Sequence, residues 1–243
     1  MQISLLAKII ELLCPRYCPI CGKRLLSEEE ILCLACNLHL PRTDTWQNPE
    51  DNEMAKLFWH SIPIMKCCSL FHYHGHTPAS SLIYQLKYNQ HSEIGPAMGR
   101  LLAHEAQKID FFADIDGIVP IPLATKRIRE RGYNQSEAIA QGLHDVTQID
   151  ILKHLITRKS FNESQTDKNR WERNNNVKNV FALTPDYAPN GCKAATLVDK
   201  HLLIVDDVCT TGATIISCCK ELLKATDTLK FSVLTIGLSL IHI

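Results

Sequence analysis

One stretch, Leu202 to Ile215, most constrains what this chain can fold into. It reads LLIVDDVCTTGATI, and its first four residues have the apolar, β-branched character of a short buried strand. The run ends at two adjacent carboxylates, Asp206 and Asp207, and a small hydroxyl-rich turn then leads into the apolar spacing of a helix. The stretch therefore predicts a strand that passes directly into the N-terminus of a helix.

The turn in this stretch has the chemistry of a phosphate site. Backbone N–H groups and the positive end of the helix dipole would face the ligand, threonine hydroxyls add donors, and glycine allows close approach. The residues expected to hold the phosphate are Cys209, Thr210, Thr211, Gly212, Ala213 and Thr214. We interpret Cys209 as a filler, although a helix N-terminus would lower its thiol pKa.

The two carboxylates need a different partner, because acids beside a phosphate site repel the anion. Asp206 and Asp207 are compatible with the site if they face the hydroxyls of a sugar or a magnesium ion. Phosphate, polyol and metal together indicate a phosphorylated ribose.

The opening stretch and three further segments carry a family resemblance. Within the opening stretch, VDDVCTTGAT resembles the phosphoribosyl pyrophosphate motif of type I phosphoribosyltransferases. Together with an N-terminal cysteine cluster, LKYN at 86–89 and VPIPLATKRIRERGYNQ at 119–135, it resembles the ComF family of competence-associated proteins, which includes the GntX-like proteins. The resemblance covers nearly the whole chain. It implies a domain that binds phosphoribosyl pyrophosphate with magnesium.

Composition limits the alternatives. The 243 residues suit one α/β domain with a small appendage, and a hydrophobic content of 45% is sufficient for a core. With 26 basic and 26 acidic residues the net charge is zero, which argues against a DNA-coating protein and requires a local patch for any nucleic-acid binding. The first residues, MQISLLAKIIELL, make a poor signal peptide, so we expect a cytoplasmic protein without membrane insertion.

Two cysteine pairs predict a metal module. Cys18 and Cys21 form one C-x-x-C pair and Cys33 and Cys36 form another, and Gly22 gives the first pair its tight turn. Four sulfur ligands leave no open coordination position, so the expected zinc is structural. The alternative is four buried free thiols. Cys14 has a less usual spacing, and we treat it as a bystander.

The apolar patterns predict three regions: an N-terminal helix and zinc-ribbon-like module at 1–44, a linker at 45–64, and a phosphoribosyltransferase-like domain at 65–243. Within the last we expect helices near 78–87, 94–106 and 135–143. Strands are expected at 67–73, 117–121, 150–156, 181–183, 202–205 and 231–236. This order predicts an α/β fold with a mostly parallel sheet and a ligand at the carboxyl ends of its strands.

Basic residues follow the strand expected at 117–121. Lys126, Arg127, Arg129 and Arg131 precede the sequence GYNQ and are placed to hold a pyrophosphate. A solvated basic helix face is the alternative. By the resemblance, this segment occupies the pyrophosphate side of the family's fold.

A polar stretch, Arg158 to Arg173, predicts a mobile loop. The resemblance implies that such a loop closes over the pyrophosphate, with Gln165 and Thr166 followed by the cations Lys168, Arg170 and Arg173. A disordered spacer is the alternative. Lys87 would reach the same cleft or lie on the surface, and the sequence leaves both open.

These patterns favour an enzyme that transfers a phosphoribosyl group to an acceptor and releases pyrophosphate. Asp206, Asp207, Lys168 and Arg170 would stabilise the charges that develop during the transfer. The alternative is a non-catalytic factor of natural transformation that binds single-stranded DNA or a partner such as a DNA-uptake helicase. Tyr133 and Trp171 are candidates for stacking on bases in that case.

Overall fold

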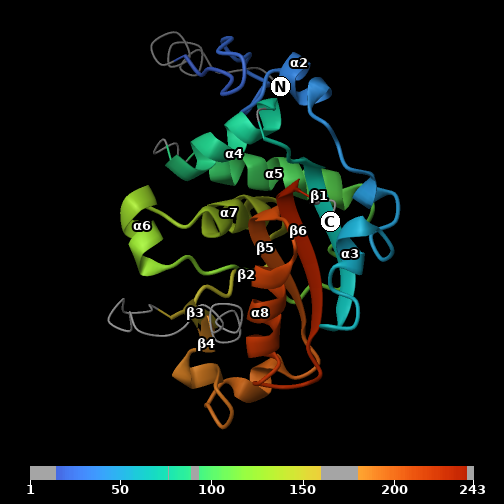
Figure 1. The fold of residues 1–243 in the computed structure, drawn as a ribbon, viewed down its shortest axis with the longest axis vertical. Coiled ribbons are helices and arrows are strands. Elements are labelled where there is room, and N and C mark those ends of the chain that lie inside the picture. Colours follow the sequence, from blue (N-terminus) through green and yellow to red (C-terminus); the bar gives the residue numbers. More distant parts are fainter. Residues whose placement is uncertain (1–14, 76, 89–92, 160–179, 240–243) are drawn as a thin grey trace, which may run out of the picture.

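A computed structural model describes residues 15–75, 77–88, 93–159 and 180–239 of the chain. Its centre is a four-stranded parallel sheet with the strand order β1-β6-β5-β2 (Figure 1). The strands of this sheet are β1 (Ile64–His72), β2 (Gly117–Pro120), β5 (His201–Cys209) and β6 (Lys230–Leu238). The predicted α/β class with a mostly parallel sheet is confirmed.

The sheet is covered on both faces, and the alternation along β5 shows why its sequence is continuously apolar. Leu203 and Val205 pack into one hydrophobic cluster, whereas Leu202 and Ile204 pack into the other. Successive side chains of a strand point to opposite faces, so a strand buried on both faces needs apolar residues at every position.

Three helices cover one face of the sheet, namely α4 (Pro78–Tyr88), α5 (Ile94–Gln107) and α7 (Gln135–Thr147). The backbones of α5 and α7 approach closely at Gly99 and Gly142. The opposite face is covered by α8 (Ala213–Leu222) and by α3 (Glu53–Lys56), with Phe58 buried beside them. Each face thus has its own core.

The remaining elements lie around this sandwich. A second sheet has two antiparallel strands, β3 (Ile156–Arg158) and β4 (Phe181–Leu183). The helix α6 (Thr125–Arg131) projects from the loop after β2, and α2 (Leu34–His39) belongs to the cysteine module above α4 and α5 (Figure 1). Short 3-10 helices are η1 (Asp44–Trp46), η4 (Pro185–Tyr187) and η5 (Ala194–Leu197).

One predicted strand is wrong. Residues 150–155 form no strand, and only Ile151 makes an isolated parallel bridge to Ile118. The strand begins at Ile156 and pairs antiparallel with β4, so neither β3 nor β4 joins the main sheet. Each of these strands has only three residues, and local propensity does not indicate which sheet so short a strand joins.

The segment predicted to be a linker, 45–64, is packed rather than extended away from the core. Asn52 caps α3 by accepting hydrogen bonds from the backbone of Met54 and Ala55 at 3.0 Å each. Met54 and Phe58 are fully buried against the sheet. The proposed boundaries at 44 and 65 stay predictions, but this segment contributes to the core of the main domain.

Candidate functional site

The turn between β5 and α8 lies at the carboxyl end of the central strand, as the sequence predicts. Gly212 has a φ of +72° and precedes the first residue of α8, and a Cβ at this position would lie 2.8 Å from the ring of Phe58. Thr210, Thr211, Ala213 and Thr214 are exposed. The turn residues line a small hollow together with Asp206. Because the first N–H groups of a helix lack partners within it, this hollow suits an anion.

Asp206 and Asp207 lie half-buried beside this turn. Oδ1 of Asp206 accepts a hydrogen bond from Ser136 Oγ at 3.0 Å and another from the Asp207 backbone N–H at 2.9 Å. Ser136 is at the start of α7, where Asn134 Oδ1 accepts a hydrogen bond from its N–H at 3.1 Å. The fold therefore holds one carboxylate in a fixed orientation.

Burial raises the pKa of Asp206 to about 7, and the neighbouring charge of Asp207 raises it further. Hydrogen bonds from the Asp207 backbone and Ser136, together with the charge of Lys87, oppose this rise. A strongly perturbed carboxyl group in a surface hollow is typical of a functional site.

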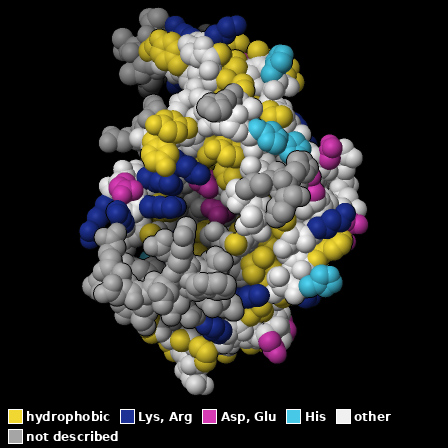
Figure 2. All heavy atoms as spheres, in the orientation of Figure 1, with side chains coloured by type: hydrophobic (Ala, Val, Ile, Leu, Met, Phe, Trp, Pro, Cys, Tyr) yellow, Lys and Arg dark blue, Asp and Glu magenta, His cyan; other side chains and the backbone are white. Residues whose placement is uncertain are grey.

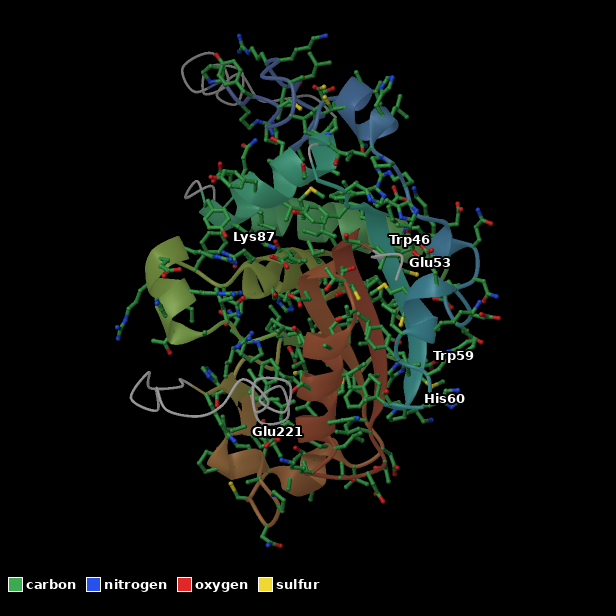
Figure 3. All side chains as sticks on the ribbon, viewed as in Figure 1. Trp46, Glu53, Trp59, His60, Lys87 and Glu221 are labelled. Carbon is green, nitrogen blue, oxygen red and sulfur yellow. The ribbon has the colours of Figure 1, made fainter. Side chains whose placement is uncertain are left out.

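Lys87, whose place the sequence left open, reaches the carboxylate pair. Its Nζ lies 3.0 Å from Asp207 Oδ2, and the side chains of the two residues are only 23% and 13% exposed. Figure 3 shows Lys87 at the end of α4. The carboxylate pair thus has a cation beside it.

The basic segment forms the helix α6, and its predicted residues are displayed rather than buried. Lys126, Arg127 and Arg129 are exposed, while Arg131 donates a hydrogen bond to Gln135 at 2.9 Å and lies over the ring of Tyr88 at 5.2 Å. Figure 2 shows basic side chains gathered around acidic ones on this face of the molecule.

Two residues that our sequence interpretation did not assign to the site lie near the carboxylates. One is Ser136, and the other is Arg158 at the end of β3. Burial lowers the pKa of Arg158, the nearby charge of Arg127 lowers it further, and Asp206 opposes the shift. Ser136 had one signal in the sequence, since it follows the helix-capping Asn134 closely. Arg158 had none beyond its place at the start of the polar stretch.

The predicted lid residues Gln165, Thr166, Lys168, Arg170 and Arg173 lie outside the described residues, as do Trp171 and Cys14. Their roles stay predictions. The expected lowering of the Cys209 pKa is wrong, because burial and the charge of Asp206 raise the pKa of this thiol to about 12. Cys209 is therefore a packed side chain, consistent with its interpretation as a filler.

The four predicted cysteines come together in space. The sulfur atoms of Cys18, Cys21, Cys33 and Cys36 all lie within 4.8 Å of one another, and those of Cys21 and Cys33 are 3.6 Å apart. Sulfur ligands about 3.8 Å apart are what a tetrahedral zinc site with bonds of about 2.3 Å requires. This cluster can hold a metal ion.

The backbone of the module is arranged to stabilise the thiolate of Cys18, whereas burial and the neighbouring cysteines raise the pKa of Cys36. Gly22, with a φ of +69°, donates its N–H to the Cys18 carbonyl at 2.9 Å and closes the tight turn. Burial raises the pKa of Cys18, but backbone hydrogen bonds from Cys33, Cys21 and Ile20 outweigh it and lower this pKa to about 7. A deprotonated sulfur is the form that binds a metal.

The class of this protein is defined by three features: a parallel sheet in an α/β fold, a strand–turn–helix unit with paired carboxylates, and a cluster of four thiols.

No protein-family model matches the chain. DNA utilization protein YhgH of Escherichia coli is 30% identical over 215 residues, covering 85% of this chain and 84% of that protein. The YhgH protein of Salmonella typhi is 33% identical over 150 residues, covering 60% and 62% respectively. Competence protein F of Haemophilus influenzae is 29% identical over 150 residues, with the same shares. The chain belongs to the ComF family of competence-associated proteins.

Among the described residues, no helix is both long enough and apolar enough to cross a membrane.

Proposed function

We propose that this protein binds phosphoribosyl pyrophosphate and transfers its phosphoribosyl group to an acceptor, releasing pyrophosphate. The observation that carries the proposal is the carboxylate pair beside the exposed turn. Asp206 is fixed by Ser136, and the turn offers N–H groups and threonine hydroxyls within the same hollow. An anion site adjoining two hydrogen-bond acceptors matches a sugar phosphate, whose phosphate end is anionic and whose hydroxyls are donors.

In this proposal the residues act by positioning and electrostatics. The Thr210–Thr214 turn holds the 5-phosphate, and Asp206 and Asp207 accept hydrogen bonds from the ribose hydroxyls. As pyrophosphate departs, positive charge develops on the sugar, and the two carboxylates beside it stabilise that charge. In the proposal, Arg127, Arg129 and Arg131 bind the leaving pyrophosphate, which carries negative charge.

Magnesium is expected to accompany the substrate. A hard cation prefers oxygen ligands, and pyrophosphate and sugar hydroxyls supply them next to the carboxyl oxygens of Asp206 and Asp207. When bound, the ion would neutralise charge on the leaving pyrophosphate. Zinc is proposed for the thiol cluster, where Cys18, Cys21, Cys33 and Cys36 would fill all four positions of a structural site.

Replacing both carboxylates tests the proposal. Asp206→Asn with Asp207→Asn removes two charged acceptors, each contributing roughly 1.5 kcal/mol or more, so affinity for magnesium phosphoribosyl pyrophosphate should fall about 100-fold. Isothermal titration calorimetry measures the affinity, and circular dichroism checks that the variant is folded. Unchanged affinity in a folded variant would refute the proposal, and pyrophosphate release with a defined acceptor would separate catalysis from binding.

A second candidate function is a non-catalytic factor that binds single-stranded DNA or a partner protein. Two observations favour it. Relatives carry the names DNA utilization protein and Competence protein F. In addition, α6 displays basic residues next to Tyr84 and Tyr88, whose rings are 4.9 Å apart and more than half exposed. Exposed aromatic rings beside cations are typical of surfaces that stack on single-stranded bases.

Salt dependence tests this second function. Changing Arg127, Arg129 and Arg131 to Gln should weaken binding of an oligothymidine and reduce its salt slope by roughly 0.7 for each phosphate that is no longer neutralised. The matched control changes the exposed Lys56, Lys108 and Lys224 to Gln, which removes the same charge elsewhere. Equal reductions in the two variants would indicate unspecific charge attraction and contradict a site on α6.

A further inference from the structure

Lys87 is more than a surface cation near the site. It pairs with Asp207 at 3.0 Å, and this is the only ion pair of Asp207 among the described residues. Asp206 differs, because its Oδ1 already accepts two hydrogen bonds from Ser136 and the backbone. A ligand hydroxyl that binds Oδ2 of Asp207 must therefore compete with the ammonium group of Lys87.

The last turn of α4, which carries Lys87, is anchored on both sides. Tyr133, from the segment after α6, donates a hydrogen bond from its hydroxyl to the Leu86 carbonyl. Gln85 donates from Nε2 to the Pro19 carbonyl of the cysteine module at 2.5 Å. Leu82 and Leu86 are buried in the core beneath. Although lysine has a flexible stem, its Cα is held at a fixed place beside the carboxylates.

The charges around Lys87 indicate what it does when a ligand enters. An ammonium group has three donors, and the described residues show one of them used on Asp207. A ligand that brings sugar hydroxyls to Asp207 and a pyrophosphate beside it offers Lys87 a more strongly charged acceptor. We propose that Lys87 is a ligand-binding residue that neutralises Asp207 in the free protein and transfers its hydrogen bonds to the pyrophosphate of the bound ligand.

This inference rests on the proposed phosphoribosyl pyrophosphate site and adds a residue to it. The inference assigns Lys87 to the pyrophosphate end of the ligand and not to its ribose phosphate end. Ribose 5-phosphate has the hydroxyls and the phosphate but no pyrophosphate, so it gains nothing from Lys87. Removal of the lysine charge frees Asp207 for the hydroxyls and takes away only the interaction with pyrophosphate.

Calorimetry on the full zinc-loaded chain tests the inference with two probes, ribose 5-phosphate and magnesium phosphoribosyl pyrophosphate. Lys87→Met should lower affinity for the pyrophosphate-bearing ligand about 10- to 100-fold, as expected when one charge-assisted hydrogen bond is removed, while ribose 5-phosphate binds equally or more tightly. Lys87→Arg keeps the charge and should restore most of the affinity. The control Lys224→Met removes an exposed lysine from its pair with Glu221 and should change neither affinity.

The outcomes distinguish this inference from the proposed function. If the wild-type chain binds neither probe, the proposed function and the inference fail together. If Lys87→Met retains the wild-type affinity for phosphoribosyl pyrophosphate, or loses affinity for both probes equally, the inference alone is overturned. An equal loss would identify the Lys87–Asp207 pair as structural, and the failure of Lys87→Arg to recover would support the same conclusion.

Discussion

Asp206 is the residue whose chemistry the fold changes most. Burial and the charge of Asp207 raise its pKa from 3.8 to about 7, so the folded protein holds a proton on Asp206 that the unfolded chain loses. Below the unfolded-state pKa the carboxyl is neutral in both states, and the stabilisation is fully present. It is lost progressively as the pH rises from the unfolded-state pKa to the folded-state pKa, because the unfolded chain then releases a proton that the folded protein keeps, and the loss is complete above the folded-state pKa.

Asp206→Asn should therefore stabilise the protein at neutral pH while weakening the site. The Asn Oδ1 can still accept from Ser136 and from the Asp207 backbone, but it carries no charge. The difference in unfolding free energy between variant and wild type should be small near pH 4, grow up to about pH 7, and level off at roughly 4 kcal/mol by pH 8. Urea denaturation at each pH measures it.

The control for this prediction is Asp227→Asn, which changes an exposed carboxylate in a turn. Its stability relative to wild type, measured at each pH, gives the effect of removing an exposed carboxylate. A difference for Asp206→Asn that is constant or that shrinks as the pH rises would show that Asp206 ionises as easily in the folded state as in the unfolded chain.

At the same scale, the sequence could predict those site residues that are contiguous. Asp206, Asp207 and the Thr210–Thr214 turn lie within one strand–turn–helix unit, so their neighbourhood is fixed by local geometry. The partners Ser136 and Lys87 come from other helices, and only the packing of α7 and α4 on the sheet brings them to the carboxylates. No local pattern reveals such an interaction.

At the scale of elements, the close approach of α5 to α7 holds Ser136 in place. A Cβ on Gly142 would lie 1.9 Å from the Pro96 carbonyl oxygen, and one on Gly99 would lie 2.1 Å from that of Ile139. Side chains at these positions would force the helices apart. These glycines are thus needed because the two helices approach each other closely, and not because the backbone has a positive φ.

Gly142→Ala should destabilise the protein by about 2–3 kcal/mol, because the added methyl group overpacks a close approach of two backbones. The midpoint of denaturant unfolding measures the loss, with the slope expected to stay unchanged. Gly75→Ala is the control, since a Cβ there meets nothing within 4 Å, and its effect should stay within about 0.5 kcal/mol. Equal midpoints for the two variants would contradict tight packing between α5 and α7.

The helices and the strands of the main sheet were predictable because their apolar periods are long. The prediction of helix 94–106 corresponds to α5, and the strand at 231–236 corresponds to β6 with its ends extended. The strand predicted at 150–156 was misplaced, although the equally short strand predicted at 181–183 matches β4. β3 has only three residues, and its antiparallel pairing with β4 depends on interactions across a long stretch of chain.

At the scale of the whole molecule, the cysteine module is joined to the main domain by apolar packing and by an ion pair. Cys18, Leu25 and Leu32 belong to the same hydrophobic cluster as the buried face of α4. Arg100 of α5 pairs with Glu30 of the module and also lies 2.9 Å from Asp145 of α7. The spacing of the cysteines predicted the four ligands. The contacts between the module and the main domain could not be predicted in this way, because they depend on which helices lie beneath the module.

Removal of metal from the module should therefore loosen α4 and leave the sheet intact. A module this small would depend on the metal that its four cysteines can hold, since such a metal contributes on the order of 10 kcal/mol in sites of this type. When the module unfolds, the hydrogen bond from Gln85 to Pro19 breaks, and amides in α4 should exchange faster with deuterium. Amides in β5 and β6 should keep their protection, since both faces of these strands stay covered. Hydrogen exchange read by mass spectrometry, before and after chelation, measures both.

Two cysteine variants separate metal loss from other effects of the chelator. Cys33→Ser with Cys36→Ser should reproduce the faster exchange in α4, because the metal then lacks two of its four ligands. Cys192→Ser changes an exposed cysteine outside the cluster and should leave the exchange unchanged. If α4 keeps its protection after metal loss, the module and the main domain are energetically independent, and if β5 and β6 lose theirs as well, the chain unfolds as one unit.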